Sequence, residues 1–157
     1  HDWNLKNVFT RTKSRENAKK RIFSWLYNPN STDDKVDKIY DRKILKDMYF
    51  DKVLGKVYTQ FGREIDADED HAISYIIQST AADLVFEQMY KVWEFLRGKK
   101  SFVKFCNHDS LVIDLSEEDQ YDINQISKLF SNTRFGKFKI NHEGGKNWSE
   151  MKPLHIK

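Results

Sequence analysis

The chain has 157 residues, the length of one domain or of part of a larger one, and 32% of its residues are charged against 39% hydrophobic. No run of about 18 apolar residues exists, which excludes a transmembrane helix, and the opening residues lack the pattern of a secretory signal. A single cysteine, Cys106, excludes an internal disulfide and a cysteine-based zinc cluster. We therefore expect a cytoplasmic protein without a membrane partner.

Positive charge is concentrated at the N-terminus. Residues 1–28 carry seven lysines and arginines against two acids, whereas the whole chain has a net charge of only +3. A basic segment with interleaved aromatic rings is one pattern of proteins that contact phosphate groups. Basic surface helices are also common in proteins that bind no polyanion, so the charge alone leaves both interpretations open.

Two helical patterns occupy the first part of the chain. Residues 14–27 have apolar side chains every three or four positions, Ser14 suits the N-cap, and Pro29 disfavours helical geometry in the residue before it. Residues 35–61 form a second pattern with apolar side chains at every fourth position, and Gly62 is its predicted end.

An acidic segment, residues 64–70, precedes the third helix. It is predicted to be a solvated loop that favours the positive N-terminal end of that helix, and a metal site is the alternative. The helix itself is predicted over residues 70–97, where Gly98 ends it.

The periodicity changes after Gly98. Strand-like runs at 102–106 and 111–115 flank four polar residues, which predicts a β-hairpin with a polar tip. Ser116 opens a predicted helix to about Phe130, and a final strand is expected over 138–142. The predicted order, α-α-α-β-β-α-β, is that of an α+β fold with a small antiparallel sheet.

Four residues of the helix 14–27 could form a ligand-binding surface. They are spaced by four, so they lie along one ribbon that drifts slowly around the helix: Arg15, Lys19, Phe23 and Tyr27. The two cations could hold phosphate groups, and the two rings could contact a sugar and a base. The alternative is an amphipathic helix whose rings belong to the core and whose cations are solvated.

Polar residues stand out at two further places. His108 and Asp109 lie at the predicted hairpin tip, where a rigidly held carboxylate suits a divalent cation. The plainer interpretation is a turn aspartate that hydrogen-bonds its own backbone, and a metal phosphohydrolase that uses the His-Asp pair is a distant third. Gln78 lies within the apolar start of the third helix, where an ordinary buried hydrogen bond is the alternative.

Taken in order, these motifs resemble the C-terminal region of family A DNA polymerases, the group of bacterial DNA polymerase I and many bacteriophage replicases. The ribbon of the helix 14–27 is similar to the family's fingers helix, motif B. Residues 78–83 resemble its Gln-Gly-Thr-Ala-Ala-Asp segment, and residues 108–112 resemble the palm motif C, His-Asp-Glu-Leu-Val. Residues 61–63 and 145–148 are similar to further landmarks of the family.

The resemblance implies a fingers-like part, residues 1–62, and a palm-like part, residues 63–157. It implies that Arg15 and Lys19 bind the phosphates of the incoming deoxynucleotide and that Lys19 donates a proton to the leaving pyrophosphate. Phe23 would pack on the deoxyribose, and Tyr27 would lie near the template base.

The resemblance also implies roles for residues of the palm-like part. Gln78 would contact the minor groove of primer–template DNA, and His108 would support the primer end. Asp109 would hold two Mg²⁺ ions, which lower the pKa of the primer hydroxyl and stabilise the departing phosphates. The sequence departs from the family's residues at four positions: Asn28, Ser74, Ser79 and Ser110.

The family's second metal-binding aspartate belongs to motif A, Asp-Tyr-Ser-x-x-Glu, and no such segment occurs in the sequence. We therefore expect the fingers and distal palm of a phage-like DNA polymerase that acts in the bacterial host's cytoplasm. By itself the chain should be inactive, because motif A and a thumb would come from an upstream polymerase segment, in cis or in trans. The alternative is a nucleic-acid-binding module that kept the fold and lost the chemistry.

Overall fold

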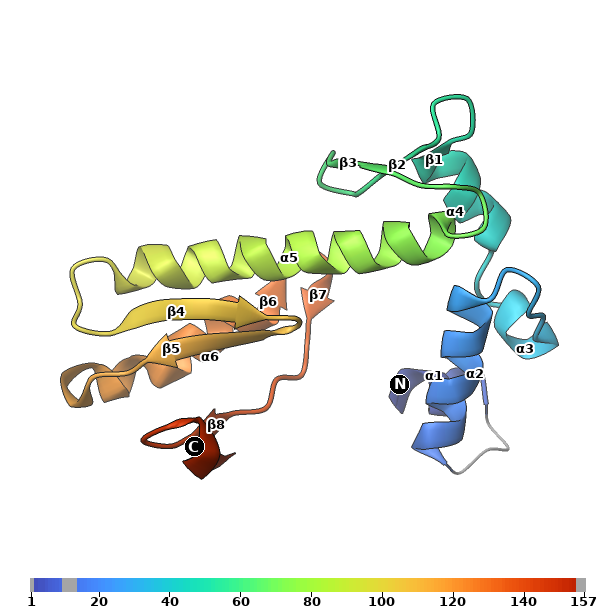
Figure 1. Cartoon of the computed structure of the whole chain (residues 1–157). Coiled ribbons are helices and arrows are strands. Elements are labelled where there is room, and N and C mark those ends of the chain that lie inside the picture. Colours follow the sequence, from blue (N-terminus) through green and yellow to red (C-terminus); the bar gives the residue numbers. More distant parts are fainter. Residues whose placement is uncertain (1, 10–13, 155–157) are drawn as a thin grey trace. The chain divides into compact units, whose positions relative to one another are not determined.

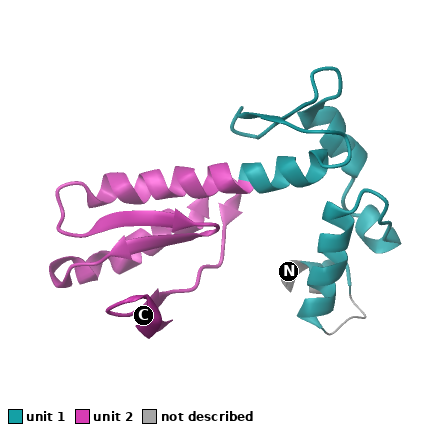
Figure 2. Ribbon diagram, in the orientation of Figure 1, with its two compact units in different colours: residues 1–80 teal, residues 81–157 magenta. Residues whose placement is uncertain are grey.

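The structure, a computed structural model, describes residues 2–9 and 14–154 (Figure 1). It has an α+β fold in which all sheets are small and antiparallel. The chain divides into two compact units, residues 1–80 and 81–157, which are described separately below (Figure 2). The division at residue 62 into a fingers-like and a palm-like part was expected on functional grounds, and it stays a prediction.

Unit 1 begins with the helices α1 (Asp2–Asn7), α2 (Arg15–Tyr27) and α3 (Asp34–Asp37). The helix predicted over 14–27 is confirmed. The Ser14 side chain caps α2 by accepting a hydrogen bond from the Asn17 backbone at 3.3 Å, and the helix ends at Asn28, before Pro29.

Trp25 is the largest side chain in the core of these helices and is only 2% exposed. Its indole Nε1 donates a hydrogen bond to the Asp37 carboxylate at 2.6 Å, and the Arg42 guanidinium lies 4.6 Å from its ring centroid. The core itself is formed by six buried side chains: Val8, Phe9, Ala18, Ile22, Trp25 and Val36. The burial of Trp25 therefore ties α2 to α3 through a polar contact as well as apolar packing.

The single helix predicted over 35–61 is wrong. The structure has α3, then α4 (Arg42–Tyr49), and then the strands β1 (Phe50–Asp51) and β2 (Lys56–Tyr58). Asp33 and Asp41 each accept hydrogen bonds from the backbone of the residues that follow, so two separate helices begin there.

A tight turn joins β1 to β2. The Asp51 carboxylate accepts hydrogen bonds from the backbone N–H groups of Val53 and Leu54, both at 2.9 Å, and Gly55 follows with φ of +62°. Of the apolar side chains that suggested a helix, Val53 is 94% exposed at this turn and Val57 is buried in β2. The spacing of these apolar side chains by four positions therefore does not indicate a helix, because it runs across a turn.

The acidic segment is also only partly a loop. Residues Glu64–Asp66 form β3, which pairs with β2 and completes a three-stranded sheet in the order β1-β2-β3. Glu64 and Asp66 face solvent while Ile65 packs against the core formed by Val57, Ala72 and Ile76. The strand was not predicted because the segment is mostly acidic, and only one of the strand's three side chains, that of Ile65, is apolar and faces the core.

The long helix α5 (Ala72–Leu96) confirms the prediction over 70–97. In unit 2 it packs with the hairpin β4 (Phe102–Asn107) and β5 (Ser110–Asp114), which was also predicted, and with α6 (Ile123–Ser131). The predicted helix that opens at Ser116 starts as the 3-10 helix η1 (Glu117–Asp122).

The strand predicted over 138–142 is wrong. On either side of it the structure has two-residue hairpins: β6 (Asn132–Thr133) with β7 (Gly136–Lys137), and β8 (Glu143–Gly144) with β9 (Lys152–Pro153). The 3-10 helix η2 (Trp148–Glu150) lies between β8 and β9. Residues 138–142 belong to no strand, because within the described chain backbone hydrogen bonds are made only at the two ends of the segment: Phe138 N–H donates to the Ser131 carbonyl at 2.9 Å, and the His142 carbonyl accepts from Leu154 N–H at 2.8 Å.

None of the helices in the described ranges is both long and apolar enough to cross a membrane.

The hydrogen bond between Trp25 and Asp37 should make the stability of unit 1 depend on pH. This bond is the largest cause that lowers the pKa of Asp37 below its usual value. A lowered pKa in the folded state gives a stabilisation that is complete above the unfolded value of about 3.9 and is lost as the pH falls through the folded value.

A double-mutant cycle of Trp25→Phe with Asp37→Ala, followed by urea unfolding, measures the free energy of the Trp25–Asp37 hydrogen bond. The cycle cancels the contribution of the cavity that each single change leaves. We expect a coupling energy of about 1–2 kcal/mol at neutral pH, less than the usual value for a hydrogen bond to a charged group because Asp37 is exposed to solvent, and a smaller one at about pH 3. A coupling energy that is the same at both pH values would contradict this account of Asp37.

Candidate functional site

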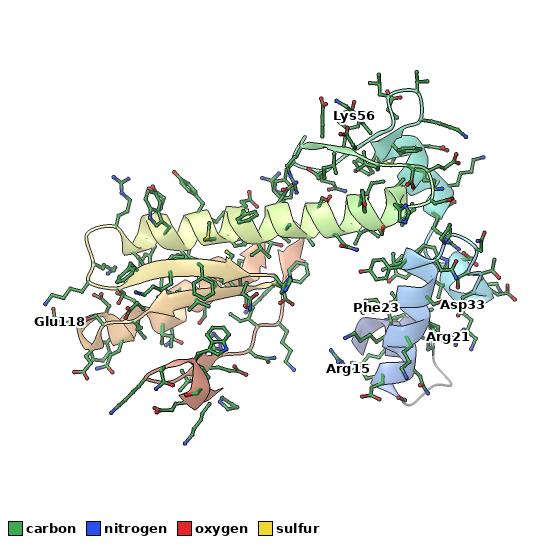
Figure 3. The ribbon with its side chains drawn as sticks, viewed as in Figure 1. Arg15, Arg21, Phe23, Asp33, Lys56 and Glu118 are labelled. Carbon is green, nitrogen blue, oxygen red and sulfur yellow. The ribbon has the colours of Figure 1, made fainter. Side chains whose placement is uncertain are left out.

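The α2 ribbon, defined here as Arg15, Lys19, Phe23 and Tyr27, lies outside the buried stripe of its helix. Figure 3 labels Arg15 and Phe23 of this ribbon on α2. Arg15, Lys19 and Tyr27 are exposed, and Phe23 is half-buried at the edge of the core. The structure therefore combines the two interpretations of this helix, because Phe23 packs against the core and its neighbours along the ribbon face solvent.

Three side chains of the α2 ribbon touch in sequence. The Lys19 ammonium lies 5.2 Å from the Phe23 ring centroid, and the Phe23 and Tyr27 rings are 5.5 Å apart with a tilt of 58°. Such distances fit a cation–π contact and a tilted aromatic pair. The ribbon is thus a continuous surface with positive charge at one end and two rings at the other, a distribution that could accept a phosphorylated ligand with a ring system.

His108 and Asp109 form the whole loop of the β4–β5 hairpin. The register pairs Asn107 with Ser110, so two residues remain at the tip, and both are exposed. His108 has φ of +52°, and among the described residues other than glycine no second one has a positive φ. The left-handed geometry costs a residue with a side chain some free energy, which the pairing of the two strands must offset.

A metal ion at this tip would need more ligands than the tip provides. Mg²⁺ takes oxygen ligands in octahedral geometry, and Asp109 offers one carboxylate. Within residues 2–9 and 14–154, no group of three or more histidine, cysteine, aspartate or glutamate side chains is placed to hold a metal ion. The described residues thus do not form a complete metal site, although Asp109 could contribute one ligand to a site completed from elsewhere.

The acidic segment 64–70 offers no better metal site, since the described residues there form no group of three or more potential ligands, and two of its five carboxylates pair with lysines. Lys56 contacts Glu64 at 2.8 Å, and Lys52 contacts Glu69 at 2.6 Å. The bond from Lys52 holds the pKa of Glu69 below its usual value. These are exposed ion pairs of the ordinary surface kind.

The segments 59–63 and 78–80 meet in unit 1, which the sequence did not predict. The backbone N–H of Gln60 donates to the Thr80 hydroxyl at 3.4 Å, and the Arg63 guanidinium donates to the Ser79 carbonyl at 3.2 Å. These bonds fasten the β2–β3 loop to α5 next to Gln78, which is exposed. Two motifs whose bonded residues are 16 and 20 positions apart in the chain thus form one local structure.

Ser74, one turn before Gln78, has a local structural role. Its side chain is buried and donates to the His71 carbonyl at 2.8 Å, within the first turn of α5. A serine hydroxyl bonded to its own helix in this way has no capacity to reach outward as a donor.

The C-terminal segment 145–148 is explained by packing. A Cβ on Gly145 would lie 2.6 Å from the carbonyl oxygen of Glu150, so this position accepts only glycine. Three residues later the Trp148 ring stacks on Phe105 of β4, with centroids 6.3 Å apart. The close turn at Gly145 thus lets the C-terminal segment cover part of the hairpin that carries Asp109.

A groove in unit 2 was also missed by the sequence. It has a volume of about 490 Å³, and its lining comes from α5 and from β4 with the adjoining tip: Ala82, Val85, Phe86, Met89, Lys104, Phe105, Cys106 and His108. Burial raises the pKa of the Cys106 thiol, whose sulfur lies 3.1 Å from that of Met89. The groove depends on contacts between segments about twenty residues apart, which no local pattern encodes.

The predicted site residues fall in both units. The α2 ribbon and Gln78 belong to unit 1, whereas His108 and Asp109 belong to unit 2. Each group is locally well defined by the contacts described above, and their roles toward a ligand stay predictions.

Comparison with known proteins finds similarity to DNA polymerase I of Borreliella burgdorferi, with 32% identity over 93 residues. The match covers 56% of this chain and 10% of that polymerase, so the chain spans about a tenth of its relative's length. No family model matches the chain, and no solved structure matches it. The chain is therefore related to a DNA polymerase over part of its length.

The positive φ of His108 makes a testable prediction about the hairpin. His108→Gly should raise the free energy of unfolding of unit 2 by about 0.5–1 kcal/mol, because glycine adopts this conformation without the steric cost. Ser110→Gly, at a regular strand position, should instead lower it by a similar amount. Thermal unfolding followed by circular dichroism measures both, and a loss of stability in His108→Gly would mean that the imidazole itself stabilises the tip.

Proposed function

We propose that this chain is the nucleotide-binding and distal palm part of a DNA polymerase that adds deoxynucleotides to a primer 3′ end. The observation that carries the proposal is the continuous row Lys19–Phe23–Tyr27 on the surface of α2. Its order, cation and then two rings, matches the order of phosphate, sugar and base in a nucleotide. The partial similarity to a DNA polymerase supports the same assignment.

In this proposal the cations of the α2 ribbon hold the incoming nucleotide. Arg15 can form a bidentate contact to phosphate oxygens, while Lys19 supplies a compact charge and a proton for the leaving pyrophosphate. Phe23 is held at the edge of the core, so its ring gives the deoxyribose a surface of fixed position. Tyr27, at the end of the helix, contacts the template base.

The remaining residues bind DNA and contribute to the metal site. Gln78 donates to the acceptors that every base pair presents in the minor groove, and His108 contacts the primer end. Asp109 supplies one carboxylate to a site for Mg²⁺, and residues outside this sequence supply the others. Bound there, two Mg²⁺ ions would make the primer hydroxyl more acidic and stabilise the charge of the leaving phosphates.

The setting we propose is the replication of phage DNA in the cytoplasm of a bacterial host. It is supported by the departures of Ser79 and Ser110 from the pattern of the polymerases that the chain resembles. The segment with motif A and a thumb would act together with this chain, either in the same polypeptide or as a separate one.

A pair of variants distinguishes a specific contact of Lys19 with the nucleotide from a general effect of the positive charge of α2. Lys19→Ala should weaken the binding of a deoxynucleoside triphosphate by roughly tenfold, the usual effect of losing a charge-assisted hydrogen bond. Lys20→Ala is the matched control, because Lys20 is also exposed and cationic but lies about 100° further around the helix. Isothermal titration calorimetry measures both variants, and an equal loss in the two would mean that only the overall charge of α2 matters.

The proposed dependence on a second segment is tested by reconstitution. The 157-residue chain should bind primer–template DNA weakly, with a strong dependence on salt, and extend no primer. Adding a polypeptide with motif A and a thumb should restore extension, and Asp109→Asn should abolish the restored activity without unfolding the chain.

Two results would overturn this proposal. Primer extension by the chain alone would contradict the incomplete metal site. Failure of every such polypeptide to restore extension, with DNA binding intact, would favour the alternative of a nucleic-acid-binding module without catalysis.

A further inference from the structure

Arg42, at the start of α4, is held in place from two directions. Its guanidinium lies 4.6 Å from the ring centroid of Trp25, which is only 2% exposed. Its backbone is fixed because Asp41 caps α4, accepting hydrogen bonds from the backbone N–H groups of Lys43 and Ile44. The guanidinium therefore has a defined position beside the core, so it is able to orient another segment of the chain.

The segment that this guanidinium binds is the loop directly after α2, residues 28–31. The Nη1 atom donates to the carbonyls of Asn28 and Pro29 at 3.3 and 3.4 Å, and Nη2 donates to the carbonyl of Ser31. A guanidinium carries several donors in one rigid plane, so it can serve three carbonyls of one loop at once. Arg42 thus joins the start of α4 to the loop at the end of α2.

The same loop folds back on the last turn of α2, which ends at Tyr27. The backbone N–H of Asn28 donates to the Ser24 carbonyl at 3.0 Å, and the hydroxyl oxygens of Ser24 and Ser31 are 3.1 Å apart. The last turn of a helix has carbonyl groups without partners inside the helix and frays, so contacts just beyond it decide whether the turn stays closed. The position of Tyr27 therefore depends on the loop and, through the loop, on Arg42.

We propose that Arg42 is a positioning residue for Tyr27 and thereby for the selection of the correct base. The inference rests on the proposed function, in which Tyr27 contacts the template base. The Tyr27 ring is 44% exposed and contacts the Phe23 ring, so the core by itself does not enclose it. A ring held in place rejects a wrongly shaped base pair more strongly than a ring that can yield. Arg15 and Lys19, at the other end of α2, hold the phosphates independently of this contact.

The variant Arg42→Lys separates the geometry of this side chain from its charge. Lysine keeps a positive charge near the end of α2, but it lacks the planar group that covers an indole and reaches three carbonyls at once. Arg21→Lys is the matched control. The Arg21 guanidinium lies 4.2 Å from the centroid of the buried Phe9 ring and donates to the Asp33 carboxylate at 2.6 Å (Figure 3). Both changes remove a guanidinium from a core ring, but these partners of Arg21 lie outside the loop.

Fluorine NMR of the chain labelled with fluorotyrosine reports on Tyr27 without any catalysis. The line of Tyr27, one of seven tyrosines, is the line that Tyr27→Phe removes. We expect this line to move or broaden in Arg42→Lys and to stay unchanged in Arg21→Lys, while urea unfolding shows a similar loss of stability in both variants. An unchanged line in Arg42→Lys, or an equal change in both variants, would mean that Arg42 only stabilises the core and would overturn the proposal.

A second variant replaces the first if Arg42→Lys does not fold. Ser31→Ala loosens the loop by removing the contact between the hydroxyls of Ser31 and Ser24, and it leaves the core around Trp25 unchanged. The Tyr27 line should change in this variant too. An unchanged line would contradict the link from the loop to Tyr27, on which the proposal depends.

The effect on accuracy is measured in the reconstituted polymerase, as the ratio of wrong to right nucleotides inserted. Arg42→Lys should raise this ratio roughly two- to tenfold, the effect of loosening one aromatic contact, and Arg21→Lys should change it less than about twofold. When Tyr27→Ala is already present, Arg42→Lys should add almost nothing, because the ring through which it acts is gone.

A full additional effect of Arg42→Lys on top of Tyr27→Ala would overturn the proposal, since Arg42 would then act by another route. A polymerase that cannot be reconstituted would instead count against the proposed function. The NMR measurement on the chain alone would still decide whether Arg42 positions Tyr27.

Discussion

The burial of Trp25 fixes the rotation of α2 about its own axis. Once the indole is packed in the core and bonded to Asp37, the other side chains of α2 have no freedom to exchange faces. The burial of Trp25 thus leaves Arg15, Lys19 and Tyr27 exposed and Phe23 half-buried at the edge of the core. Arg42 reinforces the arrangement, since it covers the indole and donates to the carbonyls of Asn28, Pro29 and Ser31 at the end of the helix.

A similar relation holds in unit 2, where the register of one hairpin decides what its tip presents. The pairing of Asn107 with Ser110 leaves two residues for the loop, so His108 has to adopt a left-handed conformation and Asp109 is held at the tip. A slip of one residue would turn Leu111 away from the core against which it packs. Core packing therefore positions the acidic side chain that the proposed function needs.

Local sequence patterns correctly predicted those helices and strands for which capping residues, apolar periodicity and helix-ending residues all indicate the same element. The helix 14–27 has a cap, a periodic apolar stripe and a proline beyond its end, and the hairpin has two apolar runs around polar residues. The prediction of a single helix over 35–61 was wrong because the apolar residues keep a spacing of four positions across the Asp51 turn. The aspartates that begin the two short helices and the turn carry the opposite signal, but each is weak by itself.

Contacts between distant segments could not be predicted from the sequence. The bond of the Gln60 backbone to Thr80 and the stacking of Trp148 on Phe105 bring together residues 20 and more positions apart, and nothing in either segment specifies the other. The candidate site residues were instead chosen by the order of residue types along the chain, and their roles stay predictions. Which groups complete the site depends on residues beyond those patterns.

The close approach at Gly145 restricts how the C-terminal segment can change by mutation. Every missense change of a glycine codon introduces a Cβ, and at this position that atom meets backbone, which cannot move aside as a side chain could. At the neighbouring Gly144 the nearest atoms that a Cβ would meet are Cδ1 and Cγ of Leu154, and this side chain has other rotamers. Adjacent and identical residues should therefore differ sharply in mutational tolerance, with variation accepted at 144 and purged at 145.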